Sequence, residues 1–393
     1  MVEAEGSSGL QVGQRFTIDV GRVAHGGHFI AHAHGSTIFV RGAITGERVE
    51  VEVTEVKKRI AMAETIEVKV PSPHRVDPPC HYFREKACGG CDFQHIDLSY
   101  QRSLKAEVVK ESFRRIAGIE IAVDCLAAEG ERDGLSWRSR MDFTLTPSRN
   151  VALHPYRSDS LTEIDRCLIA GEGIEIEKIN EFAREQSLAP FERVRVGIDR
   201  SDRMVMTGKV EMEVKGKRFL VSLDSFWQPH RSAASTLVGA LVERMRPMNG
   251  EHVLDLYGGV GLFTAFLRDS VGDGGRVTLV ESDPISVKDA RSIFKGDTRV
   301  TVVSDRVEVA LTKIDHCDRI LVDPPRSGVG EKALDQMVGL EPRQLLYISC
   351  DPATLARDAK RLVDRGFRLD SVVAYDLFPM TEHIESVANF IRA

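Results

Sequence analysis

The fold of this chain is decided by the stretch Leu254-Asp255-Leu256-Tyr257-Gly258-Gly259-Val260-Gly261-Leu262-Phe263. An apolar strand runs into a glycine-rich turn, and the turn leads into a helix. Glycine lets the backbone approach a bound nucleotide closely at such a turn. The next apolar strand ends in Leu279-Val280-Glu281, where a carboxylate can accept hydrogen bonds from both hydroxyls of a ribose. Together the two features predict a nucleotide-binding α/β fold.

The spacing of the glycines separates two classes of cofactor. The turn reads G-G-x-G after Asp255, whereas dinucleotide-binding folds carry G-x-G-x-x-G. We therefore favour S-adenosylmethionine over a cofactor that contains a pyrophosphate. Two later strands also end in carboxylates. We expect Asp323 to face the cofactor crevice, and Asp305 is either an adenine contact or a turn residue.

The rest of the chain divides by its pattern of strands and helices. From residue 233 onward the two alternate, which predicts a doubly wound, mainly parallel sheet. The first seventy residues contain short strands separated by glycine-rich turns, which predicts a small β-barrel. A proline-rich linker follows at 71–79, and residues 120–225 mix strands and helices. Residues 99–116 carry a helical apolar stripe, with Ser99 as the expected N-cap.

A second stretch, Tyr347-Ile348-Ser349-Cys350-Asp351-Pro352, places a thiol at the end of a strand. Near the C-terminus, Thr381-Glu382-His383-Ile384-Glu385-Ser386 places carboxylates on a later loop. The two stretches supply a candidate nucleophile and base beside the cofactor. Free cysteine is only about 3% thiolate at pH 7, so a reactive Cys350 must be activated. The alternative is a buried cysteine that acts as a small hydrophobic residue.

The residue that follows Asp323-Pro324-Pro325 bears on the reaction. Enzymes that methylate exocyclic amines carry an aromatic residue there, which stacks on a flipped base. This chain has Arg326 instead, and a cysteine follows one strand later. The sequence therefore argues for a chemistry that uses the thiol.

Composition and cysteine spacing indicate where the protein works. With 393 residues the chain can form two or three domains, and a net charge of −6 restricts any nucleic-acid binding to local basic patches. Neither a signal peptide nor a membrane span is evident, so we expect a cytoplasmic protein without membrane contact. Seven cysteines are an odd number, and three lie close together at Cys80, Cys88 and Cys91. This spacing argues for a metal site in a reducing compartment.

Five motifs, in this order and spacing, resemble one family: the S-adenosylmethionine-dependent RNA uridine-C5 methyltransferases that carry a TRAM domain and an iron–sulfur cluster, which methylate 23S rRNA or tRNA. The likeness covers nearly the whole chain. The motifs are Phe226-Trp227-Gln228-Pro229, Leu254 to Phe263, Val322 to Gly328, Tyr347 to Leu355, and His383-Ile384-Glu385.

The resemblance implies an α/β protein of three parts. Residues 1–70 would form the TRAM domain, an OB-like RNA-binding β-barrel. Residues 71–230 would form a central α+β domain with the iron–sulfur loop, and its helix at 99–116 would pack on the catalytic domain. Residues 231–393 would form the Rossmann-like class I methyltransferase domain.

The resemblance also assigns roles to single residues. Cys350 matches the nucleophile and Glu385 the base. Cofactor contacts fall at Gln228, Tyr257, Glu281 and Asp323, with Asp305 as a further candidate, and Leu262 replaces a polar residue that related enzymes can carry. The metal ligands would be Cys80, Cys88, Cys91 and Cys167. Four thiolates suit a [4Fe-4S] cluster or zinc, and the resemblance favours the cluster.

The expected partner is RNA, with rRNA favoured over tRNA, and no obligate protein partner is evident. Two alternatives remain open. The enzyme could methylate cytosine C5 or a base nitrogen, or the chain could be a non-catalytic RNA-binding protein. The target uridine, the oligomeric state and the role of Arg326 are not readable from the sequence.

Overall fold

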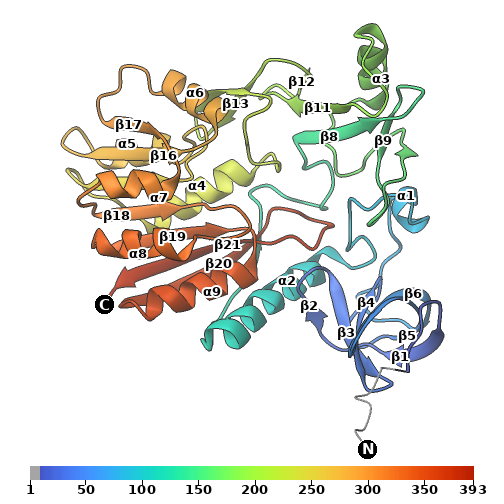
Figure 1. Ribbon diagram of the computed structural model, residues 1–393. Helices are drawn as coiled ribbons and strands as arrows, with labels where there is room; N and C mark the ends of the chain where they lie inside the picture. The colour runs from blue at the N-terminus through green and yellow to red at the C-terminus, as the bar shows by residue number, and fades with distance from the viewer. Residues whose placement is uncertain (1–8) are drawn as a thin grey trace, which may run out of the picture.

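The computed structural model describes residues 9–393 and contains three sheets and a separate hairpin. Figure 1 shows the N-terminal sheet, the central sheet and the C-terminal sheet as three bodies, with helix α2 (Leu98–Ser112) between the first and the last. Among the described residues, no helix combines the length and the apolar character needed to cross a membrane.

The N-terminal sheet is a closed barrel, as predicted. Its six strands lie in the order β1-β5-β6-β4-β3-β2. Gly21 N donates to Ile30 O and Ile30 N donates to Arg22 O, both at 2.8 Å, so the chain after β1 pairs with β3 and joins the two edges. A Cβ at Gly21 would lie 2.8 Å from Ile30 O, which explains the glycine. The strands are β1 (Arg15–Asp19), β2 (Val23–Ala24), β3 (His28–Ala33), β4 (Ser36–Arg41), β5 (Arg48–Lys57) and β6 (Ile60–Val70).

The central sheet has five strands in the order β10-β9-β8-β11-β12. The helix α3 (Ile176–Glu185) contributes Ile179 and Ala183 to the same core as Phe143 and Val196 of the sheet. The short helix α1 (His81–Arg84) lies just before this sheet in the cysteine-containing segment. The strands are β8 (Arg140–Leu145), β9 (Val151–Leu153), β10 (Thr162–Glu163), β11 (Arg193–Ile198) and β12 (Met204–Val205).

The C-terminal sheet has eight strands in the order β17-β16-β15-β18-β19-β21-β20-β7. The first five run parallel, and β21 lies antiparallel between β19 and β20. This is the predicted doubly wound sheet, and its strands are apolar because helices cover both faces. The strands are β7 (Cys125–Ala127), β15 (His252–Leu256), β16 (Arg276–Glu281), β17 (Val300–Ser304), β18 (Arg319–Val322), β19 (Gln344–Ser349), β20 (Phe367–Asp376) and β21 (Glu385–Arg392).

The helices of the C-terminal part alternate along the chain with strands β15 to β20. They are α4 (Ala233–Arg244), α5 (Thr264–Ser270), α6 (Pro284–Ile293), α7 (Val307–Ala310), the 3-10 turn η2 (Leu311–Lys313), α8 (Glu331–Gly339) and α9 (Pro352–Val363).

Two segments from before residue 230 pack into the C-terminal sheet. The hairpin of β13 (Lys209–Val214) and β14 (Lys217–Ser222) shares a core with α4, in which Val210 and Phe219 join Leu237. The strand β7 pairs in parallel with β20 and forms the edge of the sheet. The division of the chain at residue 230 stays a prediction, and the core of the last sheet extends across it.

Helix α2 begins one residue before the predicted helix and has a different cap. The Asp97 carboxylate accepts from Tyr100 N at 2.9 Å and is the N-cap, so the expected cap at Ser99 is wrong. Ser99 lies inside the first turn, and its hydroxyl donates to Asp97 Oδ1 at 2.6 Å. Either residue type can cap a helix, and the one placed to reach the orphan amide does so. The helix continues into a π turn, η1 (Phe113–Ala117).

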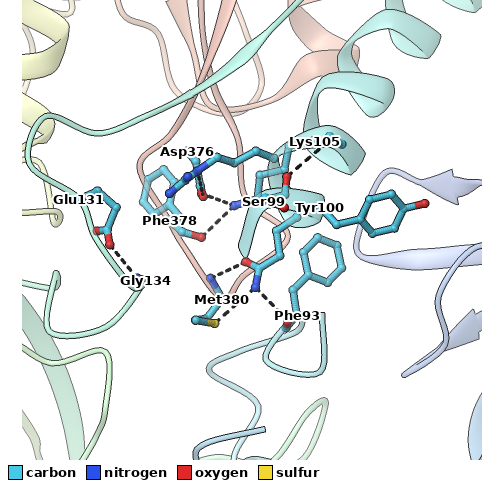
Figure 2. Close-up of polar contacts among 12 residues, drawn as sticks. Phe93, Ser99, Tyr100, Lys105, Glu131, Gly134, Asp376, Phe378 and Met380 are labelled. Carbon is cyan, nitrogen blue, oxygen red and sulfur yellow. Dashed lines mark hydrogen bonds and ion pairs between the residues drawn. The ribbon is translucent and has the colours of Figure 1, made fainter. Parts of the chain in front are cut away.

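A buried ion pair between Lys105 of helix α2 and Asp376 of β20 joins these two elements (Figure 2). Lys105 Nζ lies 2.5 Å from Asp376 Oδ1 and donates to Phe378 O at 3.0 Å. The side chains of Lys105 and Asp376 are 1% and 0% exposed, so neither charge is solvated by water. A buried charge requires such a partner, and the pair therefore fixes where α2 lies on the C-terminal sheet.

Candidate active site

The glycine-rich turn after β15 has room for glycine alone at two positions. Gly261 has a φ of +90°, and a Cβ there would collide with the ring of Phe294. At Gly258 a Cβ would lie 2.7 Å from Leu279 Cγ. The turn therefore packs its backbone directly on β16 and α6, which brings its amides to the end of the sheet.

Glu281 ties this turn to the end of β16. Its carboxylate accepts from Gly259 N at 2.9 Å, from Ser282 N at 2.6 Å and from Asp283 N at 2.7 Å. Three backbone donors hold the side chain in one orientation. A carboxylate has about four acceptor positions, so capacity for a ligand hydroxyl remains.

Three of the five predicted cofactor residues line one cleft. Tyr257, Glu281 and Asp305 face it from the carboxyl ends of β15, β16 and β17, where open α/β sheets bind ligands. The Lys313 ammonium, 3.1 Å from Asp305 Oδ2, lowers the pKa of that carboxyl. Gln228 is buried in the segment between β14 and α4 and does not line the cleft.

The fifth residue, Asp323, is half-buried at the end of β18 and also lies outside the cleft lining. Burial raises its pKa to about 7, and the charge of Asp255 adds to the effect. Burial likewise raises the pKa of Asp255 to about 7, although the Thr264 hydroxyl donates to its carboxylate at 2.6 Å. Both carboxyl groups therefore bind protons at a higher pH than an ordinary aspartate does.

The nucleophile and base candidates are neighbours across two strands. In the antiparallel pairing of β19 with β21, Ser349 is opposite Ser386. One step further along the same register lie Cys350 and Glu385. Glu385 is 4% exposed and is the first residue of β21, so it lies on a strand and not on the loop that we expected.

Charges around this pair act in opposite directions. Burial and the charge of Glu385 raise the pKa of the Cys350 thiol to about 11, while Arg326 lowers it. Burial and Asp323 raise the pKa of Glu385 well above its ordinary value, and Arg326 again opposes the shift. In the free protein both shifts favour the neutral forms of the thiol and the carboxyl group, whereas Arg326 favours the two charged forms.

Two histidines near the pair were not predicted. Arg326 Nη2 lies 3.2 Å from His383 Nδ1. His25, from the N-terminal barrel, has its Nε2 3.4 Å from Asp351 Oδ2, directly after the nucleophile candidate. His383 was visible in a motif without an assigned role, and no pattern in the sequence links residue 25 to residue 351.

The four predicted metal ligands line one cavity. The cavity is lined by Cys80, Cys88, Cys91 and Cys167 together with residues of β8 and β9 of the central sheet. Gly90 N donates to Cys88 Sγ at 3.4 Å. Burial raises the pKa of the thiols of Cys88, Cys91 and Cys167. Within residues 9–393, no three His, Cys, Asp or Glu side chains already converge on the position of a single metal ion.

Comparisons with known proteins agree with this architecture. The family model "tRNA (Uracil-5-)-methyltransferase" matches residues 302–392, and the model of the TRAM domain matches residues 9–66. A solved structure, the tRNA (uracil-54, C5)-methyltransferase of Pyrococcus abyssi in complex with S-adenosyl-L-homocysteine, has the same fold. The TM-score is 0.72 at 23% identity, with 95% of this chain and 99% of that chain covered.

Relatives by sequence span the whole chain. An uncharacterised RNA methyltransferase of Streptomyces coelicolor is 37% identical, with 96% of this chain and 93% of the relative covered. The 23S rRNA (uracil(1939)-C(5))-methyltransferase RlmD of Shewanella sp. strain ANA-3 is 28% identical, with 99% and 98% covered.

Fold and relatives define an S-adenosylmethionine-dependent RNA methyltransferase, which is an enzyme and not a binding module alone. More specifically, the chain belongs to the family of TRAM-containing RNA uracil-C5 methyltransferases.

The charges around Cys350 predict how its reactivity depends on pH. Because its pKa is raised to about 11, the thiolate fraction should rise about tenfold per pH unit between roughly pH 7 and 10. Alkylation of Cys350 by iodoacetamide, followed by mass spectrometry of its peptide, should rise in parallel. A rate that stays flat over this range would show a thiol that is already ionised.

The same measurement tests the role of Arg326. Arg326→Ala removes the cation that lowers the pKa of Cys350, so alkylation at a given pH should slow. Arg326→Lys keeps the positive charge and should stay close to the wild-type rate. Equal rates in the two variants would show that the charge of Arg326 does not reach the thiol.

Proposed function

We propose that this protein transfers a methyl group from S-adenosylmethionine to C5 of one uridine in RNA, with rRNA as the target, through a covalent bond between Cys350 and C6 of the base. The observation that supports the proposal is the register of β19 and β21: Ser349 is opposite Ser386, Cys350 and Glu385 are the next residues in that register, and the charge of Glu385 acts on the thiol. Family membership supplies the reaction class, and this pair supplies the groups that the reaction requires.

Uracil C5 is too weak a nucleophile to take a methyl group directly. The Cys350 thiolate adds to C6, and the electron pair of the C5–C6 double bond passes into the ring, so that C5 becomes electron-rich. S-adenosylmethionine supplies the electrophilic methyl group for C5. Glu385 then removes the C5 proton, and the electron pair of the C5–H bond restores the double bond and expels the Cys350 thiolate.

Arg326 favours the charged states that these steps need. The thiol must lose its proton before addition, and Glu385 must be ionised when it accepts the C5 proton. Both pKa values are raised by burial and lowered by Arg326. We assign to Arg326 the role of holding both groups closer to their reactive forms.

We place the cofactor in the cleft at the ends of β15 to β17. The oriented carboxylate of Glu281 would accept from the ribose hydroxyls, and Asp305 would accept from the adenine amine. Tyr257 lines the same cleft, and Gln228 and Asp323 are proposed as contacts to the rest of the cofactor. Leu262 is buried and apolar, so the polar contact available to some relatives is missing here.

The target base must leave its stack to reach Cys350, because a paired base cannot expose C6 to a half-buried thiol. The relatives named as 23S rRNA methyltransferases span almost the whole chain and favour rRNA. The Pyrococcus tRNA enzyme shares the fold at 23% identity, and a shared fold at that identity does not indicate which RNA is the target.

Two substitutions separate the covalent steps. Cys350→Ala should abolish methyl transfer and leave cofactor binding intact, because the thiol is needed only for the base. Glu385→Gln should let addition proceed and block proton removal, so a protein–RNA adduct accumulates as a retarded band on a denaturing gel. Full turnover by Cys350→Ala would contradict the covalent route and favour methylation of a base nitrogen, which needs no thiol. Release of a C5-methylated cytosine would identify the other alternative.

The target is tested in cells. We expect that replacing this chain with its Cys350→Ala variant removes one 5-methyluridine from 23S rRNA, measured by mass spectrometry of rRNA digests. Total tRNA from the same cells is the matched control and should keep its 5-methyluridine. Loss from tRNA with intact rRNA would reverse the assignment.

We further propose that Cys80, Cys88, Cys91 and Cys167 hold a [4Fe-4S] cluster, with zinc as the alternative. The support is that all four line one cavity and that backbone amides face two of the sulfurs: Gly90 N at Cys88, and the amides of Ile169 and Ala170 at Cys167. Such N–H donors stabilise the thiolates of iron–sulfur sites. Unoxidised thiolates also fit the cytoplasmic location that the sequence predicts.

Protein purified without oxygen should therefore contain about four iron atoms per chain, with equal sulfide and broad visible absorbance. Cys167→Ser should lose iron and absorbance. Cys317→Ala is the matched control, because Cys317 is buried in another core and should retain both. One zinc ion per chain without sulfide would identify the alternative.

A further inference from the structure

The segment that leads to Glu385 is held by residues outside the reacting pair. Residues 377–384, here called the strap, join β20 to β21, and Glu385 is the residue that follows them. Met380 in the strap has both of its backbone polar groups hydrogen-bonded to other elements: its N–H to helix α2 and its C=O to the chain that follows Cys91.

Gln101 of α2 makes the contact to the strap N–H. It is fully buried, and its side-chain carbonyl accepts from Met380 N at 3.0 Å. Its amide nitrogen donates to Phe93 O at 3.1 Å and Ile96 O at 2.9 Å and lies 3.4 Å from Met380 Sδ. Figure 2 labels Phe93 and Met380, two of the residues to which Gln101 is hydrogen-bonded. One amide therefore links the helix, the cysteine segment and the strap.

The cysteine segment holds the other side of the strap. Asp92 N and Phe93 N both donate to Met380 O at 2.9 Å. In turn, Glu382 N donates to Asp92 Oδ2 at 3.3 Å, and Arg41 of the barrel lies 3.5 Å from Asp92 Oδ1. The residue after Cys91 therefore contacts both the barrel and the strap.

The strap reaches the reacting groups at its far end. His383 lies 3.1 Å from Glu382 and 3.2 Å from Arg326, whose charge acts on Cys350 and Glu385. Packing leaves the tip little freedom, because a Cβ at Gly134 would lie 2.8 Å from Met380 Cε. A shift of Met380 would therefore move the chain that orients His383 and starts β21.

Resting on the function proposed above, we propose that Gln101 is a positioning residue for removal of the C5 proton. A buried amide is costly unless its donors and acceptor are used, and an apolar residue would fill the same space at lower cost. Here the side-chain carbonyl of Gln101 binds the strap, which leads to Glu385, and its amide nitrogen binds the segment that follows Cys91. Cys350 lies between β19 and α9, whereas the hydrogen bonds of Gln101 go to Phe93, Ile96 and Met380, so addition of the thiolate should not depend on them.

The test uses Gln101→Met, which keeps the volume and removes the hydrogen bonds. Covalent adduct formation with RNA that carries 5-fluorouridine needs Cys350 but no proton removal, so its rate should stay within about twofold of wild type. Turnover on ordinary RNA should fall about tenfold to a hundredfold, since a misplaced group of this kind costs up to about 10²-fold in rate. An adduct with ordinary uridine should accumulate, as in Glu385→Gln.

Val109→Ala is the matched control. Val109 lies on the same helix and is equally buried, but it makes none of the hydrogen bonds to the strap. It should lower thermal stability without accumulating an adduct. If Gln101→Met lost adduct formation and turnover together, or accumulated no uridine adduct, Gln101 would have only a structural role. Failure of the wild-type protein to form the 5-fluorouridine adduct would instead refute the covalent mechanism itself.

Discussion

The antiparallel pairing of β21 with β19 is the constraint on which the active site depends. β21 is inserted between β19 and β20, so the last strand of the chain meets the strand that carries the nucleophile. Side chains alternate faces along a strand, and a slip of one residue would turn Glu385 to the opposite face. Val387 packs in the core on one face of the sheet, and Ala388 and Phe390 pack in the core on the other face, so a slip would also exchange side chains between two packed cores. Packing on both faces thus fixes the register that brings the thiol and the carboxyl group together.

Low polarity around this pair sets its protonation. Burial raises the pKa of Asp255, Asp323 and Glu385, and neighbouring carboxylates cannot all ionise together at low cost. The charges of Glu385, Asp323 and Asp351 also make the Cys350 thiol harder to ionise. A positive charge nearby favours the ionised form of each of these groups. Arg326 supplies a positive charge from the protein.

Local features of the site were predictable from the sequence, and features of the tertiary structure were not. Glu281 and Asp305 follow apolar strands, and a carboxylate in that position can be recognised from periodicity alone. The N-cap of α2 was misplaced because Asp97 and Ser99 are both good capping residues, and the folded backbone decides which one reaches the amide. Contacts such as His25 to Asp351 join domains far apart in sequence, for which one chain carries no local signal.

Gln101 is another residue whose role depends on contacts between segments far apart in sequence. Its side chain joins helix α2, the segment that follows Cys91 and the strap. In the sequence it is one polar position on an amphipathic helix, and polar positions of that kind are usually solvated. In the structure, hydrogen bonds hold both the backbone N–H and the backbone C=O of Met380, a residue whose φ of +66° an unrestrained chain rarely adopts. Hydrogen bonds are directional and apolar contacts are not, so an amide defines where the strap lies while a leucine would only fill space. The path by which the strap enters β21 is therefore fixed by α2 and by the segment that carries the cysteines, in addition to the pairing of β21 with β19 and β20.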